Sequence, residues 1–556
     1  CAEGVAGPMS ADPPGPAHEP AGTPGSLPVP AWEVDDLPEP QGEPFGPGGW
    51  AVGNLGYAVD GLVAGVTGLL VAEALELGLT FVGWVSGNAS GRSPLLAVGA
   101  AFVDLTPAWL KEWAVSSFGT GDKAVLFAGM AIVLALLFAA IGMVARTRHT
   151  VAAALVGGLG VLALIALLTR AGASPTDPIP LVVGLATTVW MLRRMVARTA
   201  VDGPSRREAL GLAAAAAGVA LAESARGSGG VAAANAGASR AAAAPVPTGL
   251  PAPTSAGAEV GVPGVAPWVV PNDSFYRIDT ALVVPRLATE SWRLRVYGEV
   301  EREVTLTWAQ LLAKPLIQRH ATLACVSNEV GGHLVGNALW TGWPVRELLR
   351  EAGPKAGADM VLSRSVDGWT AGTPLEALTD DRDALLAVAM NGEALPFEHG
   401  FPVRLVVPGL YGYVSATKWV TELKITRFAV DMGYWTPRGW SALGPVKTAS
   451  RIDVPRSGAQ VSAGRVAVAG VAWAMHRGIQ GVQVRVDDGP WADARLATEP
   501  TIDSWRQWVY EWDASPGSHV LTVRARDGAG EWQTDVQTRS DPDGATGHHS
   551  VTVRVV

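Results

Sequence analysis

The sequence contains very little cysteine and little charge. Only 2 of its 556 residues are Cys, so no disulfide framework can hold it together. Neither thiol has CxxC or HxxxH neighbours, which argues against a closed zinc site. Charged residues make up 17% of the chain and the net charge is −9, which argues against a nucleic-acid partner. An unpaired thiol outside the cytoplasm tends to oxidise, so Cys325 is expected to have a ligand role or a chemical task.

Basic residues are missing from the start of the chain. Residues 1–50 contain twelve prolines and eight acidic residues but no Lys or Arg. Such a segment buries too little apolar surface to offset its chain entropy, so residues 1–56 are predicted to be a disordered, Pro-rich acidic tail. A first residue of Cys rather than Met predicts a truncated or processed start.

Long runs without charge occur within residues 57–224, which are predicted to be a transmembrane region of about five helices. Residues 124–145 and 150–169 form uncharged runs of 22 and 20 residues, long enough to cross a bilayer. The other three predicted spans are residues 57–85, 179–192 and 209–222. The first of them includes Asp60, Glu73 and Glu76, which would mark an ion path in a transporter or lie at a membrane interface.

Arginines in two loops predict the orientation of this region. The loops around 146–148 and 193–207 are the richest in Arg, so both are expected on the cytoplasmic side. Five spans then place the N-terminus inside and residues 225–556 outside. Arg206 and Arg207 in "SRREAL" resemble a twin-arginine export signal, and they equally suit ordinary topogenic charge.

The rest of the chain has the composition of a soluble protein. Residues 225–267 are rich in Ala, Gly, Pro and Ser, which predicts a flexible linker. Residues 268–445 alternate strand-like and helical segments, which predicts an α+β domain. Residues 446–556 consist of short alternating strands with turn signals, which predicts an immunoglobulin-like β-sandwich.

Cys325 lies in the stretch "RHATLACVSNEVGGHLVGNALWTGWP", between two histidines and a run of glycines. By composition alone this thiol suits a nucleophile, a metal ligand or a buried core residue. No local signature of a Cys–His protease accompanies it.

Two motifs carry a family resemblance. "ATLACVSNEVGGHLVGNALWTGWPVRELL" resembles the molybdenum-ligand segment of the sulfite oxidase family of molybdopterin enzymes. "MNGEALPFEHGFPVRLVVPGLYGYVSATKWV" resembles the second signature of that family, and the order of domains is similar too. The resemblance implies a molybdenum–molybdopterin cofactor with Cys325 as the protein ligand to the metal. It also implies a C-terminal domain that mediates dimer contacts.

The resemblance further implies a set of cofactor contacts. Arg404 would bind the pterin phosphate through two guanidinium N–H groups, and Lys418 would add a single positive charge. The full set of expected cofactor-binding residues is Asp273, Tyr276, Arg277, His320, Cys325, Asn328, His333, Asp367, His399, Arg404, Ser415 and Lys418.

Three positions depart from the sulfite-oxidising members of that family. Val330 replaces an arginine that holds the anion, and Val388 replaces a tyrosine near the oxo group. The arginine of their opening strand maps near Ile278, although Arg277 is adjacent. Because a dianion needs charge-assisted donors, these changes weaken the case for sulfite.

The sequence therefore predicts a membrane-anchored, extracytoplasmic molybdopterin oxidoreductase that transfers oxygen to or from a small sulfur-containing or other uncharged substrate. Its electrons would go to a separate cytochrome or quinone-linked partner, and no haem is expected in this chain. The alternatives are a non-catalytic membrane-anchored scaffold that displays the C-terminal domain, and a transporter formed by residues 57–222.

Overall fold

The computed structural model describes residues 47–85, 93–107, 110, 122–169, 175–202, 240 and 255–556. The predicted acidic tail up to residue 46, the span 209–222 with the preceding Arg206 and Arg207, and residues 225–254 of the predicted linker, Arg240 excepted, lie outside these ranges.

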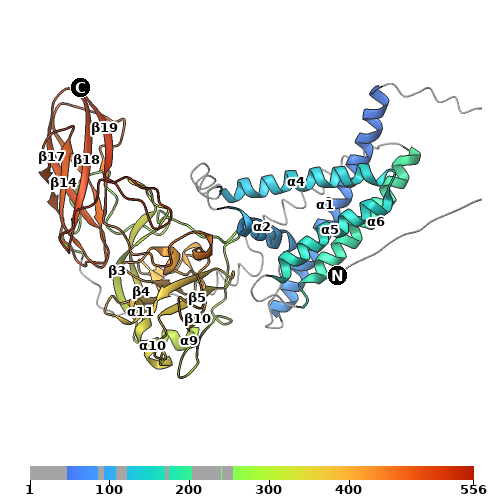
Figure 1. Cartoon of the computed structure of the whole chain (residues 1–556), viewed down its shortest axis with the longest axis horizontal. Helices are drawn as coiled ribbons and strands as arrows, with labels where there is room; N and C mark the ends of the chain where they lie inside the picture. Colours follow the sequence, from blue (N-terminus) through green and yellow to red (C-terminus); the bar gives the residue numbers. More distant parts are fainter. Residues whose placement is uncertain are drawn as a thin grey trace, which may run out of the picture. The chain divides into compact units, whose positions relative to one another are not determined.

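The N-terminal part is helical, as predicted. Among its described residues, four helices contain stretches that are long and apolar enough to cross a membrane, namely Asn54–Leu79, Val125–Ala145, His149–Leu168 and Pro178–Arg198. The helices in this part are α1 (Pro47–Val85), α2 (Pro94–Leu105), α4 (Asp122–Ala145), α5 (His149–Leu168) and α6 (Pro178–Asp202) (Figure 1).

Small residues let these helices approach closely. Gly61 on α1 meets Gly142 on α4 so tightly that a Cβ on either would overlap the backbone of the other helix. Asp60 and Glu73 of α1 are buried. The carboxylate of Glu73 accepts hydrogen bonds from Ser93 Oγ at 2.9 Å and from the Leu95 backbone N–H at 3.2 Å, so it stabilises the start of α2.

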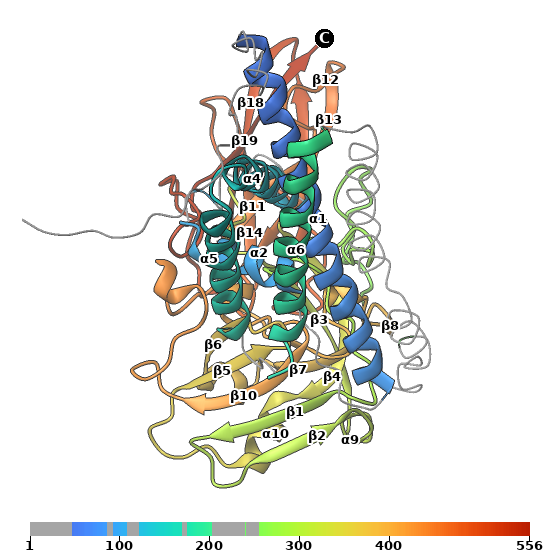
Figure 2. The same ribbon diagram turned by 90° about the vertical axis from the view of Figure 1, so that its right-hand side faces the viewer.

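Residues 293–426 form two sheets with short helices, in agreement with the predicted α+β domain. The first sheet has the order β2-β1-β10-β5-β6, and Figure 2 shows β1, β2, β5 and β10 together. Its strands are β1 (Arg293–Gly298), β2 (Val304–Thr307), β5 (Met360–Ser365), β6 (Thr370–Pro374) and β10 (Val420–Thr426). The second sheet has the order β3-β4-β7-β8, with β9 paired to β7. Its strands are β3 (Ile317–Ala324), β4 (Val335–Pro344), β7 (Leu385–Met390), β8 (Glu393–Ala394) and β9 (Arg404–Val406).

Helix α10 (Val345–Ala352) shows how local sequence produces this packing. Its buried residues recur with the period of one helical face, and Gly353 ends the helix with a left-handed φ of 66°. The buried residues of this face are Val345, Leu348, Leu349 and Ala352. The other helices of the domain are α9 (Trp308–Leu312) and α11 (Leu375–Thr379).

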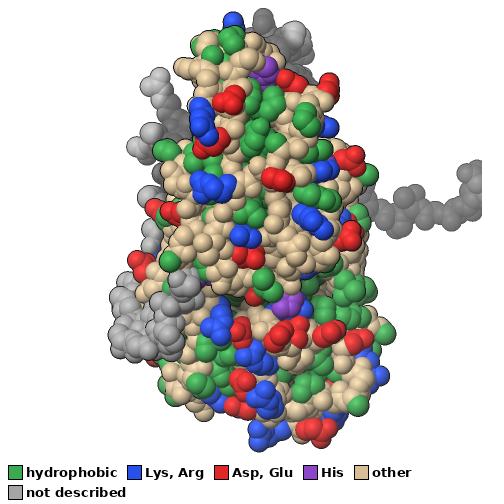
Figure 3. Space-filling model, turned by 90° about the vertical axis from the view of Figure 1, so that its left-hand side faces the viewer, with side chains coloured by type: hydrophobic (Ala, Val, Ile, Leu, Met, Phe, Trp, Pro, Cys, Tyr) green, Lys and Arg blue, Asp and Glu red, His purple; other side chains and the backbone are tan. Residues whose placement is uncertain are grey.

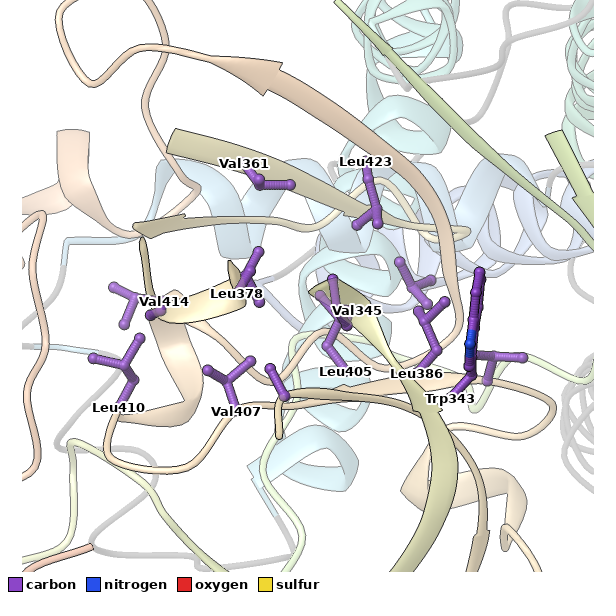
Figure 4. Close-up of a cluster of buried hydrophobic side chains, with 14 of the residues drawn as sticks. Trp343, Val345, Val361, Leu378, Leu386, Leu405, Val407, Leu410, Val414 and Leu423 are labelled. Atoms are coloured by element: carbon purple, nitrogen blue, oxygen red, sulfur yellow. The ribbon is translucent and has the colours of Figure 1, made fainter. Parts of the chain in front are cut away.

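The main apolar core lies between these sheets and helices. Trp343 and Val345 point toward Leu386 and Leu405 of the second sheet, and Leu423 approaches from the first sheet (Figure 4). This packing fixes the ends of β3, β4 and β9, where the candidate site residues lie.

Residues 449–555 form two further sheets that enclose a second apolar core, so the predicted β-sandwich is present as a pair of facing sheets. Their strand orders are β11-β13-β17-β16 and β12-β19-β18-β14-β15. The immunoglobulin-like topology stays a prediction. The strands are β11 (Ala449–Val454), β12 (Gln460–Val461), β13 (Gly464–Trp473), β14 (Ile479–Val486), β15 (Ala492–Asp493), β16 (Arg495–Leu496), β17 (Arg506–Ala514), β18 (Gly517–Asp527) and β19 (His549–Val555).

The last part of the predicted linker packs against this sandwich. The Val260 N–H donates to Gln507 Oε1 at 2.8 Å, and the Ala266 N–H donates to Asp453 Oδ2 at 2.9 Å. Ordered packing therefore begins before residue 268. On the face of the two sheet-containing domains shown in Figure 3, acidic and basic side chains are interspersed.

Candidate functional site

Cys325 begins the turn between strands β3 and β4. Residues 325–334 are called the Cys325 loop below. The Cys325 N–H donates to Leu334 O at 2.9 Å, and Asn328 Oδ1 accepts from the Leu334 N–H at 2.8 Å, so both ends of the loop are held together. Gly332 is required here because a Cβ at that position would lie 2.6 Å from Asn328 Oδ1. Asn328, predicted as a cofactor contact, thus braces the loop that carries the thiol.

The Cys325 side chain is half-buried and has donors around its sulfur. Burial raises the pKa of the Cys325 thiol, and hydrogen bonds from the Ser327 N–H, the Ser327 hydroxyl and the Val326 N–H act in the opposite direction. These donors would stabilise a thiolate ligand. Ser327 was missed in the sequence, where its position two residues after the Cys is the only signal.

Two phenols lie close to this sulfur. Burial raises the pKa of Tyr276, the negative charge of a Cys325 thiolate raises it further, and Arg404 acts in the opposite direction. Burial also raises the pKa of Tyr411 to about 12, with a smaller contribution from Cys325. Both phenols therefore keep their protons at neutral pH and present O–H donors. Tyr276 was predicted, whereas Tyr411 was not.

Arg404 begins strand β9 and is only 5% exposed. Its Nη1 donates to His399 O at 3.1 Å, its Nε donates to Leu405 O at 3.4 Å, and its guanidinium lies 5.0 Å from the centre of the Trp340 ring. Burial lowers the pKa of Arg404 to about 10, so it stays charged at neutral pH. Among the described residues no carboxylate pairs with it.

Lys418 is held near Arg404 by an acid that the sequence analysis missed. Its Nζ donates to Asp279 Oδ2 at 2.7 Å and to Glu398 O at 2.9 Å. Burial lowers the pKa of Lys418 to about 8, although Asp279 acts in the opposite direction. Arg277 also pairs with Asp279, at 2.9 Å. Asp279 lies two residues after Arg277 in the sequence.

His399 lies at the end of a short 3-10 helix, η2 (Phe397–His399), beside Arg404. Burial lowers the pKa of His399 to about 4, and the charge of Arg404 adds to this. The imidazole is therefore neutral at physiological pH. Its Nε2 lies 3.0 Å from Asn272 O, so Nε2 carries the proton and Nδ1 is left as an acceptor.

Arg277, Arg404, Lys418 and Asp279 are called the basic pocket below. Lys418 and Arg277 share the carboxylate of Asp279, whereas Arg404 has only carbonyl acceptors for its buried charge. A buried excess of positive charge is costly without an anion. The residues therefore fit the phosphate of a molybdopterin, with Cys325 as the one soft donor for the metal. No group of three or more His, Cys, Asp or Glu side chains suited to a metal ion occurs within the described ranges.

Several other predicted contacts have partners within the protein. Ser415 is buried and its Oγ donates to Tyr411 O at 2.9 Å. Asp367 accepts from the Trp369 N–H at 3.1 Å, and the exposed Asp273 accepts from Ser274 Oγ at 3.0 Å. His320 is buried with its ring centre 4.5 Å from that of Trp268, and His333 is exposed on the Cys325 loop. Cofactor roles for these five predicted residues remain predictions.

The three departures from the sulfite-oxidising pattern lie in different environments. Val330 is half-buried and lines a cavity of about 20 Å³ beside Tyr411 and Thr448. Val388 is 4% exposed and belongs to the main apolar core, whereas Ile278 is exposed. Of the three, only Val330 lines this cavity.

Comparison with known proteins identifies the family of the domain that contains this site. The family model of the oxidoreductase molybdopterin binding domain matches residues 281–435. Sulfite oxidase from Gallus gallus is 30% identical over 291 residues, which are 44% of this chain and 62% of that protein. An uncharacterised oxidoreductase, YuiH, from Bacillus subtilis is 34% identical over 153 residues, covering 28% of this chain and 74% of YuiH.

Among solved structures, the crystal structure of the sulfane dehydrogenase SoxCD from Paracoccus pantotrophus gives a TM-score of 0.46 at 25% identity, covering 51% of this chain and 81% of that one. The chain spans less than two thirds of the Gallus gallus protein. The matched domain contains the Cys325 loop and two of the four residues of the basic pocket, Arg404 and Lys418. The chain belongs to the sulfite oxidase family of molybdopterin-dependent oxidoreductases.

Proposed function

We propose that this protein is a membrane-anchored, extracytoplasmic oxidoreductase that transfers an oxygen atom to or from a small uncharged substrate, such as a sulfoxide. The observation that carries the proposal is that Cys325 and Arg404 of the basic pocket both lie near the buried Tyr276, whose phenol feels the charges of both. This arrangement suits a cofactor with a metal at one end and a phosphate at the other.

Different residues would hold the metal end and the phosphate end of the cofactor. Cys325 would supply the protein thiolate to the metal, while Arg404, Lys418 and Arg277 would neutralise the phosphate. When bound, the molybdenum cofactor supplies two-electron oxygen-atom transfer. Tyr276 keeps its proton beside Cys325, so it can donate a hydrogen bond to a substrate oxygen. Neutral His399 adds no further positive charge to the pocket.

The lack of a basic side chain at position 330 of the Cys325 loop supports an uncharged substrate. Val330 lines a cavity of about 20 Å³, which has room for about one water rather than for a substrate, and none of the described residues around that cavity is Lys or Arg. The side chains that face it include Asn328, Glu329, Val330, Tyr411, Thr448, Ser450, Gln533 and Thr546. A dianion such as sulfite needs charge-assisted donors, each contributing about 1.5–3 kcal/mol. We therefore expect sulfite to be a poor substrate.

Metal analysis and steady-state assays test this proposal. The purified full chain should contain about one molybdenum, since one thiolate is offered. With sulfite as electron donor turnover should be slow, whereas methionine sulfoxide as acceptor should be reduced. A chain free of both metal and pterin would instead support the scaffold function, and efficient oxidation of sulfite at micromolar concentration would contradict the substrate class.

The proposed location depends on the apolar helices and on the arginine-rich loops. Four described helices are long and apolar enough to cross a membrane, and Arg206 and Arg207 precede the predicted fifth span. Replacing both arginines by Lys keeps the positive charge but should block twin-arginine export. A reporter fused after residue 556 would then stay in the cytoplasm. Unchanged export would show that the pair is topogenic charge only.

The proposed partners are the substrate, the membrane and a separate electron carrier of the cytochrome or quinone-linked kind. Dimerisation through the C-terminal sandwich is also proposed, by analogy with the family. Sedimentation of the detergent-solubilised protein would test it: a monomer at all concentrations would contradict the dimer.

A further inference from the structure

We propose that Arg451, on strand β11 of the C-terminal sandwich, is a positioning residue that holds the Cys325 loop in place. The sandwich would then belong to the active site in addition to any role in dimer contacts. The ligand role of Cys325 rests on the function proposed above, whereas the hold on the loop rests on geometry alone.

The first observation is a direct hydrogen bond across the two domains. Arg451 Nη1 donates to Gly332 O, in the return half of the Cys325 loop, at 2.8 Å. The guanidinium is fixed by Asp453, whose Oδ1 accepts from Arg451 Nε at 2.6 Å, and its centre lies 6.0 Å from that of the Trp505 ring. Arg451 is only 4% exposed, so water does not compete strongly for these bonds.

The second observation is a close steric contact next to the first. Gly331 lies so near the ring of His549 that a Cβ at position 331 would overlap it. His549 is itself held by the sandwich, because its Nδ1 accepts from the Ile452 N–H at 3.0 Å. The hydrogen bond to Arg451 therefore holds the loop against the sandwich, and the contact with His549 limits how closely it can approach.

The restraint is transmitted to the thiol through a short path. Leu334, two residues after Gly332, pairs with the Cys325 backbone N–H at 2.9 Å and with Asn328 Oδ1 at 2.8 Å. Movement of the return half of the loop would move Leu334, and with it the backbone that sets the direction of the Cys325 side chain. Groups outside the metal-binding shell commonly orient ligands in this way.

The hydrogen bond from Arg451 to the loop is not needed to hold the two domains together. The Thr322 N–H donates to Asp503 O at 2.9 Å, and the Trp505 N–H donates to Thr322 Oγ1 at 2.8 Å. These bonds join the sandwich to strand β3 without using the loop. Loss of the Arg451 donor should therefore loosen the loop while the two domains stay together.

The test compares Arg451→Met with Arg506→Met in the full chain, with Cys1→Ser in both. Arg506 donates to the Ala497 and Ile479 carbonyls at 2.7 Å, so Arg506→Met also removes two arginine hydrogen bonds within the sandwich but none to the loop. The rate at which neutral iodoacetamide alkylates Cys325 is measured in protein made without the pterin. We expect Arg451→Met to raise this rate about tenfold, the factor for one lost charge-assisted hydrogen bond, and Arg506→Met to leave it unchanged. Arg451→Lys keeps the positive charge but loses the two-armed guanidinium, so its alkylation rate should lie between those of the wild type and Arg451→Met.

A second measurement uses the cofactor-loaded chain. The absorption band of the sulfur–molybdenum bond should shift in Arg451→Met and stay in place in Arg506→Met, with kcat lowered and KM little changed. Equal alkylation rates in wild type and Arg451→Met, or equal acceleration in both Met variants, would overturn the proposal. A chain that never binds molybdenum would contradict the proposed function. The alkylation comparison would still decide the role of Arg451.

Discussion

The Cys325 loop and the basic pocket are built on different physical principles. The loop is half-buried, offers one sulfur, and is held in shape by backbone and amide hydrogen bonds to Leu334. The basic pocket gathers charge, and its Arg404 is only 5% exposed and has no carboxylate partner among the described residues. The Cys325 loop would bind a metal through a soft sulfur donor held in a fixed direction. The basic pocket would bind an anion through its positive charge.

This difference indicates that the two ends of a bound molybdopterin are held independently. A change in the loop should alter the metal end without releasing the cofactor. A change in the pocket should release the cofactor without disturbing the loop. The comparison therefore yields separate predictions for each region.

The largest effect is expected from Cys325→Ser. Removing the sulfur ligand should abolish turnover, while Arg404 and Lys418 continue to hold the phosphate. Activity and pterin content of the purified variant measure the two separately. An active Ser variant with an unchanged molybdenum spectrum would show that Cys325 is not the ligand.

Arg404→Met should have the next largest effect, and it should act on cofactor retention rather than on the metal ligand. Losing a buried charged donor should weaken cofactor retention roughly ten- to hundred-fold. The melting temperature of the cofactor-free variant should be unchanged or higher, because a buried charge without a carboxylate partner is replaced by an apolar side chain. Pterin release and thermal unfolding check both points.

The control for Arg404 is Arg295→Met, which removes an exposed pair with Glu303. This variant should retain its pterin like the wild type. Equal pterin retention in the Arg404 and Arg295 variants would show that the basic pocket does not bind the phosphate.

A pH dependence follows from Lys418. Its pKa in the folded, cofactor-free protein is lowered to about 8, so the cation is lost as the pH rises through that value. Binding of the pterin phosphate should therefore weaken, about tenfold between roughly pH 7 and pH 9. Folding stability should change in the opposite sense, since between pH 8 and the ordinary lysine value the unfolded chain binds more protons and stability rises with pH.

Fluorescence titration of the cofactor-free protein with pterin at several pH values measures this step. Lys418→Met should bind more weakly at every pH and lose the step near pH 8. A flat profile in the wild type would exclude Lys418 from the phosphate site.

The smallest effect is expected from Asn328→Ala in the Cys325 loop. It removes the acceptor for the Leu334 N–H and should lower the free energy of unfolding by about 1 kcal/mol. Asn328→Asp keeps an acceptor and should lose less. Denaturant unfolding of the two variants tests the difference, and equal losses would show that the hydrogen bond contributes nothing.

Local patterns in the sequence predicted much of this protein. Runs without charge identified residues 124–145 and 150–169, which are now helices α4 and α5. Alternating strands after residue 446 predicted two facing sheets. The two motifs around Cys325 and Arg404 also identified the family, while the roles of the two residues stay predictions.

The sequence by itself therefore determined the kinds of element and the main chemical groups, because helical period, strand alternation and side-chain chemistry are local properties. Only the tertiary structure decided which groups meet. Asp279 reaches Lys418 across 139 positions, and Arg451 reaches Gly332 across 119. No local pattern records such pairs, because the packing of whole sheets sets the distance between segments that are far apart in the chain.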